Sequence, residues 1–209
     1  MMTLKRWMAL GLLAAACGSS SNPPPDAGTP AGSGTLTGTV NGQTLTVRDA
    51  VFGITPGSLN VNVVVGDRTG LCSLLTATTI PGPTTVFGFG MLNLATPVTP
   101  AAVGLGTYSY VDLFHLPPLT SPGAGQWWDG AFAVATNCAP TGTFATAGTV
   151  TVAQVGTTAT HLKVVLNNLT FPDGGTLAGN VEAVYCSALQ SQSPPCGGIS
   201  LLAPMAVFE

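Results

Sequence analysis

The feature that most constrains the fold of this chain is a two-residue alternation of Thr with apolar or small residues. Residues 35–40 read TLTGTV, and residues 44–51 repeat the pattern as TLTVRDAV. Successive side chains of a β-strand point to opposite faces, so these runs predict strands with one polar and one apolar face. The Asn41-Gly42 pair between them is typical of a tight hairpin turn, because both turn residues need a positive φ.

Similar runs, separated by Gly, Pro and Asn, continue along the chain. Further candidate strands are residues 58–66, 84–94, 106–115, 127–137, 148–155, 160–170 and 176–186, with 199–208 as a final strand that would close the sheet. Asp173-Gly174-Gly175 predicts a hairpin between the last two internal runs. About ten short strands separated by turn signals are typical of a sandwich or a barrel, and we expect an antiparallel β-sandwich.

One segment departs from the alternation. In residues 67–79, Leu71, Leu74 and Leu75 share one helical face, and Asp67 is a candidate N-cap. We expect a short helix here whose apolar face covers one end of the sandwich.

Charge excludes several classes of protein. Charged residues make up 6% of the chain and the net charge is −3, whereas a soluble domain usually has about 25% charged residues. The chain has no excess of Lys and Arg, so it lacks the basic surface that binding to nucleic acid requires. The scarcity of Glu and Lys disfavours a helix-rich fold, and 45% hydrophobic residues disfavour disorder.

The first residues have the organisation of an export signal. Lys5 and Arg6 precede the apolar run 7–16, which is too short to span a bilayer as a helix, since that takes about 20 residues. The small residues 14–16 suit a cleavage site, so residues 1–16 are predicted to be a signal peptide.

The residues at this cleavage site, Leu13-Ala14-Ala15-Ala16-Cys17, resemble the lipobox of bacterial lipoprotein signals. They depart from it in one respect, because Ala14 stands where Leu is preferred. The resemblance implies that Cys17 becomes the first residue and carries acyl chains, two or more of which give stable membrane anchoring. The alternative is an ordinary signal peptide with an incidental Cys. Gly18 stands where an inner-membrane retention Asp would lie, and the resemblance therefore favours the outer membrane.

Two further parts follow the signal. Residues 17–34 comprise the lipidated Cys and a flexible linker of small, polar and Pro residues. Residues 35–209 are enough for a single core and form the predicted β-sandwich domain.

Four further cysteines, Cys72, Cys138, Cys186 and Cys196, predict two disulfides in an exported chain. Three connectivities are possible. We expect a local bridge between Cys186 and Cys196, which leaves Cys72 to pair with Cys138. The chain has no CxxC motif and no His near either pair, which disfavours a metal or redox site.

The titratable residues select no catalytic or metal site. No GxSxG motif accompanies His115 or His161, and the odd separation of Asp112 from His115 puts them on opposite faces of a strand. Neither a DxDxDG loop nor an HxH pair is present. We therefore predict no catalytic residues, no metal and no cofactor.

Aromatic residues are the remaining candidates for a ligand site. In a strand, Trp127 and Trp128 face opposite sides, and Trp128 shares its parity with the core candidate Phe132. Tyr108 and Tyr110 also share one parity. Exposed rings at these positions would suit a sugar or peptide ligand. The alternative is that these rings pack in the core and at its rim.

A weak internal repeat is also present. Residues 34–40 and 175–181 both fit the pattern GTLxGxV. Duplication of a half domain would explain it, and so would a chance match between two strands rich in Gly and Thr.

The strand-rich layout, the Pro/Ser linker and the segment GGTLAGNVEAVYC of residues 174–186 together resemble small envelope lipoproteins of the myxobacterial type. The resemblance implies a cellular location and no biochemical activity. We expect a non-enzymatic structural or binding module of the cell envelope, anchored through Cys17 to the outer membrane or cell surface, with a protein or glycan partner. A carbohydrate- or peptide-binding module that uses the aromatic residues and a secreted hydrolase are the alternatives.

Overall fold

The structure is a computed structural model that describes residues 31–56, 59–77, 82–97, 99–112, 122–136 and 139–190. In these ranges the chain forms eleven strands, one α-helix and one 3₁₀ turn. The strands are β1 (Ser33–Thr39), β2 (Asp49–Ile54), β3 (Val61–Gly66), β4 (Thr84–Thr96), β5 (Thr99–Ala101), β6 (Gly106–Tyr110), β7 (Gly125–Thr136), β8 (Ala139–Phe144), β9 (Ala147–Gln154), β10 (Leu162–Thr170) and β11 (Thr176–Tyr185). The helical elements are α1 (Leu71–Thr76) and η1 (Ser187–Gln190).

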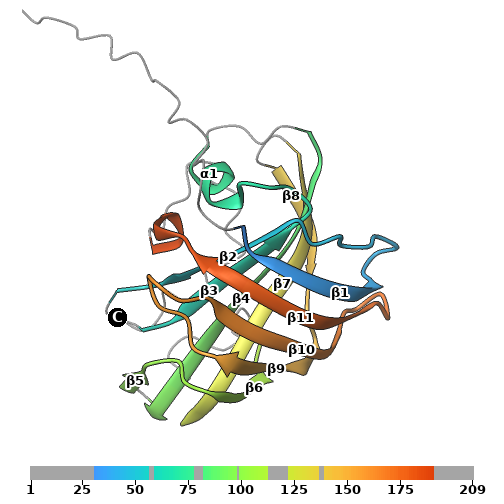
Figure 1. The fold of residues 1–209 in the computed structure, drawn as a ribbon. Helices are drawn as coiled ribbons and strands as arrows, with labels where there is room; N and C mark the ends of the chain where they lie inside the picture. Colours follow the sequence, from blue (N-terminus) through green and yellow to red (C-terminus); the bar gives the residue numbers. More distant parts are fainter. Residues whose placement is uncertain are drawn as a thin grey trace, which may run out of the picture.

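Eight of these strands close into a barrel (Figure 1). Their order is β4-β3-β2-β11-β10-β9-β6-β7, and β7 pairs back onto β4 from Thr84↔Ala135 to Leu94↔Gly125. The strands β1, β5 and β8 are added at the edges of β11, β4 and β7. An all-β fold with one short helix is confirmed, but the predicted antiparallel sandwich is wrong, because hydrogen bonding continues around the ring. Two neighbouring pairs, β2–β11 and β6–β7, are parallel.

The interior of the barrel is filled by large side chains. An eight-stranded barrel is just wide enough for its inward-facing residues to fill it. The largest fully buried side chains are Trp128, Tyr108, Phe52, Phe87, Phe89 and Phe132. Gly130 on β7 lies opposite Phe89 on β4, and a Cβ at Gly130 would lie only 2.6 Å from that of Phe89. The glycine therefore leaves the space that the aromatic residue needs.

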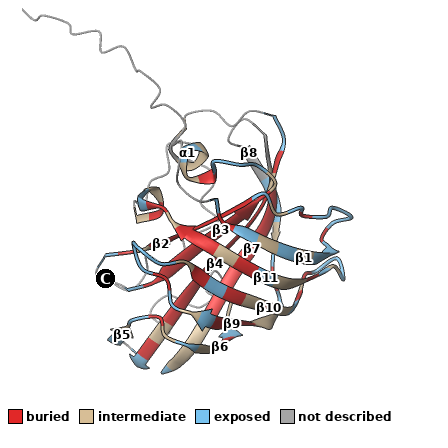
Figure 2. Ribbon diagram, viewed as in Figure 1, coloured by how far each residue is buried: buried red, intermediate tan, exposed pale blue. Residues whose placement is uncertain are grey.

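The outer surface of the barrel has two different sides (Figure 2). The strands β2, β3 and β4 are buried on both faces, and their outward residues Val51, Val64 and Val86 pack in one cluster with Leu71 of α1 and Leu189 of η1. By contrast, β9, β10 and β11 alternate between buried and exposed residues. The exposed side is polar, as the alternation of the sequence predicts.

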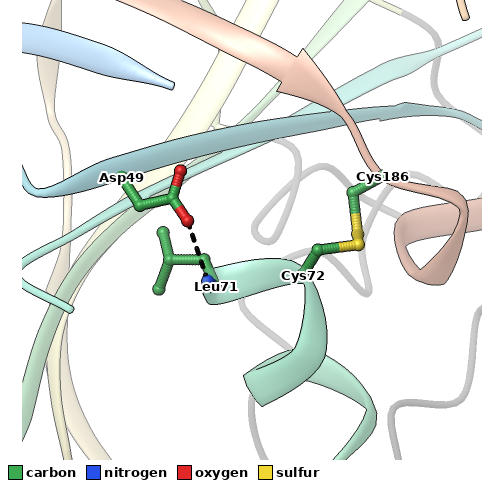
Figure 3. The surroundings of a disulfide bond; sticks show 4 residues. All are labelled: Asp49, Leu71, Cys72 and Cys186. Atoms are coloured by element: carbon green, nitrogen blue, oxygen red, sulfur yellow. Dashed lines mark hydrogen bonds between the residues drawn. A yellow bond between two sulfur atoms is a disulfide. The ribbon is translucent and has the colours of Figure 1, made fainter. Parts of the chain in front are cut away.

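The helix α1 lies within the predicted segment 67–79, but Asp67 does not cap it. The N-cap is Gly70, and the amide of Leu71 donates to Oδ2 of Asp49 at 2.9 Å (Figure 3). Asp67 instead accepts a hydrogen bond from the amide of Thr85. Oδ1 of the buried Asp49 accepts from the amides of Gly32 and Ala50. One carboxylate thus joins the start of β1, the start of β2 and the start of α1.

Both predicted turns are present, but only one joins two paired strands. Asp173-Gly174-Gly175 connects β10 to β11, and the amide of Phe171 donates to the carbonyl of Gly175 at 3.0 Å. Asn41 and Gly42 have φ of 50° and 69°, and Val40 and Gln43 exchange backbone hydrogen bonds at 2.9 Å. After that bridge, however, residues 44–48 form no strand, and β1 pairs with β11 instead.

The described disulfide joins Cys72 of α1 to Cys186, which follows β11 (Figure 3). The predicted pairs Cys72–Cys138 and Cys186–Cys196 are therefore wrong. Proximity in sequence favoured the local bridge, but β11 pairs with β2 at Val184 and Tyr185, and this brings Cys186 beside α1. Cys138 and Cys196 lie outside the described residues, as do the predicted signal peptide, Cys17, His115 and the predicted strand 199–208.

The two GTLxGxV segments are neighbouring strands that pair with each other. In the antiparallel β1–β11 ladder, Leu36 lies opposite Gly179 and Gly38 lies opposite Leu177, around a centre at Thr37↔Ala178. The glycine contacts repeat with the same symmetry. A Cβ at Gly38 would overlap the carbonyl oxygen of Thr176, and a Cβ at Gly179 would overlap that of Thr35. The repeat thus places each glycine of one strand opposite a larger residue of the other.

Removing the disulfide tests the pairing of Cys72 with Cys186. The two residues are 114 apart in sequence, and the loss of loop-closure entropy predicts that the variant Cys72→Ala/Cys186→Ala is less stable by about 3–5 kcal/mol. The measurement is urea denaturation of the oxidised protein, with peptide mapping of the intact bonds as its control. Recovery of a peptide that joins Cys186 to Cys196 would contradict the pairing.

Substitution of Gly38 tests the symmetric ladder. Gly38 has a φ of 114° and is enclosed by β11, whereas Gly42 has a φ of 69° and nothing within 4 Å of an added Cβ. We expect Gly38→Ala to lower the free energy of unfolding by about 3 kcal/mol, because it adds a steric overlap to the backbone strain. The matched control Gly42→Ala carries only the strain, about 1 kcal/mol. Equal losses in thermal denaturation would rule out a close β1–β11 contact.

Candidate functional site

The aromatic residues that the sequence offered as ligand contacts do not form an exposed surface. Trp128 and Tyr108 are each 0% exposed and belong to the interior core. The indole Nε1 of Trp128 donates to the carbonyl of Gly148 at 3.2 Å, and the hydroxyl of Tyr108 donates to the carbonyl of Gly104 at 3.1 Å. Burial raises the pKa of the Tyr108 phenol. Both side chains are packing residues with satisfied donors.

The other two aromatic candidates are half-buried and pack against different hydrophobic clusters. Tyr110 packs edge-on against Trp128, with ring centroids 5.5 Å apart, and burial, followed by the charges of Asp129 and Asp112, raises the pKa of its phenol. Trp127 faces the outer side of β7, as its parity predicted, where it packs with Leu92 and Leu94. Its Nε1 donates to the carbonyl of Gly123 at 3.0 Å. The four rings therefore do not converge on one groove.

A cluster that the sequence analysis did not identify lies on the polar side of the barrel. Nδ1 of His161 is 2.6 Å from Oε1 of Glu182, and Nζ of Lys163 is 3.3 Å from Oε2 of the same carboxylate. His161 directly precedes β10, Lys163 lies at the start of that strand, and Glu182 lies opposite Lys163 on β11. The hydrogen bond from His161, and then the neighbouring Lys163, hold the pKa of Glu182 below its usual value.

This cluster depends on an irregularity of the β10–β11 hairpin. Next to the turn, Thr170 pairs with Thr176, but beyond a register shift between Leu166 and Leu169 the pairing moves by one residue. Asn168 adopts a φ of 48° at this bulge. A one-residue slip changes which residues share a face. Counting back from the turn places Lys163 opposite Ala183, and this is why the sequence did not predict its contact with Glu182.

Lys163 and Glu182 line a shallow groove of about 450 Å³ across β1, β11, β10 and β9. Hydroxyl and amide groups of Ser33, Thr35 and Asn180 complete its polar lining. The outer surface continues as a hydrogen-bonded set of neutral side chains, in which Nδ2 of Asn167 donates to the hydroxyls of Thr149 and Thr151. The groove offers hydrogen-bond donors and acceptors with little net charge.

The cluster has the geometry of an imidazole oriented by a carboxylate, which a general base can use. No hydroxyl or thiol of the described residues is hydrogen-bonded to the His161 ring. Among the same residues, no group of three or more His, Cys, Asp or Glu side chains is placed to hold a metal ion. The buried carboxylate of Asp49 accepts hydrogen bonds from backbone amides.

Two further observations bear on the class of this protein. Within the described part of the chain, no helix is long and apolar enough to cross a membrane. Comparison with family models, with curated proteins and with solved structures found no match to this chain.

The ionised form of Glu182 is the one that the folded state stabilises, so its contribution depends on pH. A carboxyl whose pKa is lowered on folding stabilises the protein above its unfolded pKa, and this stabilisation is lost as the pH falls through the folded pKa. We expect Glu182→Gln to be less stable than the wild type at neutral pH and equally stable in acid. The control is His161→Gln, which removes the hydrogen bond that lowers the pKa of Glu182 most and keeps the Glu182 carboxylate in place. Denaturation midpoints that differ by the same amount at every pH would contradict this assignment.

Proposed function

We propose that this protein is a non-catalytic binding module of the bacterial cell envelope, held at the outer membrane or cell surface by lipid on Cys17. The observation that carries the proposal is the Cys72–Cys186 disulfide. Structural disulfides form and persist in oxidising compartments outside the cytoplasm. This compartment agrees with the export signal and lipobox at the start of the sequence.

The packing of the barrel supports a module that binds at its surface. The side chains of the described core, such as Trp128, Phe87 and Phe89, occupy the space where a container protein would hold a ligand. The partner therefore meets the outside of the barrel. The polar side formed by β1, β9, β10 and β11 is the natural contact surface, because its neutral Thr and Asn side chains are exposed.

The low charge of that side favours short-range contacts over electrostatic attraction. Association steered by charge requires extended patches of one sign, whereas Lys163 and Glu182 neutralise each other here. Binding by hydrogen bonds and shape agrees with a tethered module, because a tether already raises the effective concentration of the protein near its partner.

Lipid anchoring is tested by Cys17→Ala in a bacterial host. We expect the wild-type protein to incorporate labelled palmitate and to fractionate with membranes, and the variant to lose both properties. The reason is that the acyl chains attach to this sulfur and supply the membrane affinity. The double variant Cys72→Ala/Cys186→Ala is the control, because it removes two disulfide-bonded cysteines of the folded domain together and leaves the lipobox intact. A variant that still incorporates palmitate would refute anchoring through Cys17.

A further inference from the structure

Exposed apolar side chains gather at one end of the barrel. The strand pairings give β2, β4, β9 and β11 one direction and β3, β6, β7 and β10 the other. The connections 55–60, 97–105 and 155–161 therefore lie at the same end, hereafter the neutral end, on the left and lower left of Figure 1. Of the four large hydrophobic side chains that are exposed among the described residues, three lie there. They are Leu59, Leu105 and Val155, with exposed fractions of 40%, 65% and 38%.

The neutral end carries no fixed charge. The described residues of its three connections include no Asp, Glu, Lys or Arg, and His161 is their one titratable side chain. The nearby wall of the barrel carries Lys163 and Glu182, which neutralise each other. The opposite end, by contrast, has charged residues on the connections that lead into β2, β4 and β11, namely Arg48, Asp67, Arg68 and Asp173. Because a charge is costly to remove from water, the neutral end is the end that leaves water at the lower cost.

The backbone holds Leu59 in a conformation that leucine rarely adopts. Its φ is 57°, in the left-handed region where Gly and Asn are usual. The connection around it is closed, because the amide of Thr55 donates to the carbonyl of Asn60 at 2.9 Å and the amide of Leu59 donates to the carbonyl of Thr55 at 3.1 Å. Neither core packing nor backbone conformation favours a leucine at this exposed turn, so its side chain is suited to a contact made outside the barrel.

The other two side chains are also presented by connections that are held in place. The hydroxyl of Tyr108 accepts a hydrogen bond from the amide of the residue before Leu105 at 3.0 Å and donates one to the carbonyl of that residue at 3.1 Å. Next to Val155, a Cβ at Gly156 would lie 2.4 Å from Cζ of Phe52, so this loop packs directly on the barrel interior. Both apolar side chains are thus exposed on ordered backbone.

The arrangement of the three side chains favours a lipid surface over a protein partner. A protein hot spot is a contiguous, fully desolvated cluster. Here the end of β11 separates Leu59 from Val155 and Leu105, because the order around the ring is β3-β2-β11-β10-β9-β6. The boundary between lipid headgroups and acyl chains takes up apolar side chains at separate points. Without Lys or Arg, the contact depends on apolar insertion and not on attraction to anionic headgroups.

We propose that the neutral end rests on a lipid bilayer, with Leu59, Leu105 and Val155 inserted at the boundary between headgroups and acyl chains. The inference rests on the proposed lipid anchor, because three inserted side chains are too few to hold the protein at a membrane alone. A tether raises the effective concentration of the neutral end at the bilayer and makes a weak contact sufficient. In this orientation the polar side formed by β1, β9, β10 and β11 stands upright from the membrane and remains open to a partner.

The tether is long enough for this orientation. The amide of Gly32, next to the start of β1, donates to Oδ1 of Asp49 at the start of β2 at 3.0 Å. The strand β2 has six residues, so at about 3.3 Å per residue the neutral end is about 20 Å away. Residues 18–31 separate Gly32 from Cys17, and at about 3.1 Å per residue they extend to about 40 Å. A lipid on Cys17 therefore reaches the bilayer on which the neutral end rests.

The primary experiment is methyl NMR of the lipidated protein in nanodiscs of phosphatidylethanolamine and phosphatidylglycerol that contain a spin-labelled lipid. We expect the methyl signals of Leu59, Leu105 and Val155 to lose most of their intensity, and those of Leu74 and Leu75 in α1, at the opposite end, to keep theirs. Equal broadening at both ends would overturn the proposal, because it would mean that the tethered protein tumbles freely. Changes at the same methyl groups that follow protein concentration without lipid would also overturn it, because they would indicate a second copy of the chain.

The variant Leu59→Asn separates membrane contact from folding. Asn favours the left-handed region, so we expect this variant to be at least as stable as the wild type in thermal denaturation. Combined with Leu105→Asn, it should abolish the selective broadening at Val155. The matched control is Phe144→Thr, which removes the fourth exposed apolar side chain, on β8 and away from the neutral end, and should leave the broadening unchanged. A double variant that is folded and still shows the broadening of the wild type would refute the role of the neutral end.

A histidine tag in place of residues 1–16 makes the test independent of lipidation. With this tag, Cys17→Ala is held on the nanodisc by nickel-chelating lipid and carries no acyl chain. Selective broadening there, together with no palmitate incorporation by the wild type in cells, would support the membrane contact and overturn the acyl anchor. An acylated protein without selective broadening would retain the anchor and overturn the membrane contact.

Discussion

The pairing of β4 with β7 is the contact on which the rest of the structure depends. These two strands are the longest in the described chain, and their ladder from Thr84↔Ala135 to Leu94↔Gly125 turns an open sheet into a ring. Closure places Phe87, Phe89 and Trp128 in one interior. It also exposes the outward apolar residues of β3 and β4, which α1 and η1 cover in part. The disulfide joins that cover to the end of β11.

Glycines and one bulge decide the details of this architecture. Gly130 makes room for Phe89 inside the barrel, and Gly38 and Gly179 allow β1 and β11 to approach each other. The bulge at Asn168 shifts the register of β10 and brings Lys163 opposite Glu182. Each is a local backbone feature with a distant effect, because strands transmit a change of register along their whole length.

Much of the local structure was predictable, and the failures have a common cause. The long alternating runs correspond to β4, β7, β9, β10 and β11, and the parity of Trp128 with Phe132 correctly placed the indole inside. The strands β5 and β8 were missed, because Pro100 and Pro140 favour turns. Both strands lie at edges of the sheet, where a missing amide is tolerated. The sequence left two interpretations of the aromatic residues open, and the buried positions of Trp128 and Tyr108 agree with packing in the core. Strand parity alone could not choose between them, because it does not tell which face of a strand is covered.

The sequence by itself determined that the chain is built of strands, where its two turns lie, and that its surface is neutral, because alternation and turn chemistry act between near neighbours. Only the tertiary structure decided that the sheet closes, that Cys72 pairs with Cys186, and that β1 leaves its hairpin arm to pair with β11. The disulfide and the β1–β11 ladder join residues more than a hundred positions apart, and the closing ladder joins β4 to β7, which are not consecutive strands. They depend on which strands pack around a shared interior, and local periodicity carries no information about that choice.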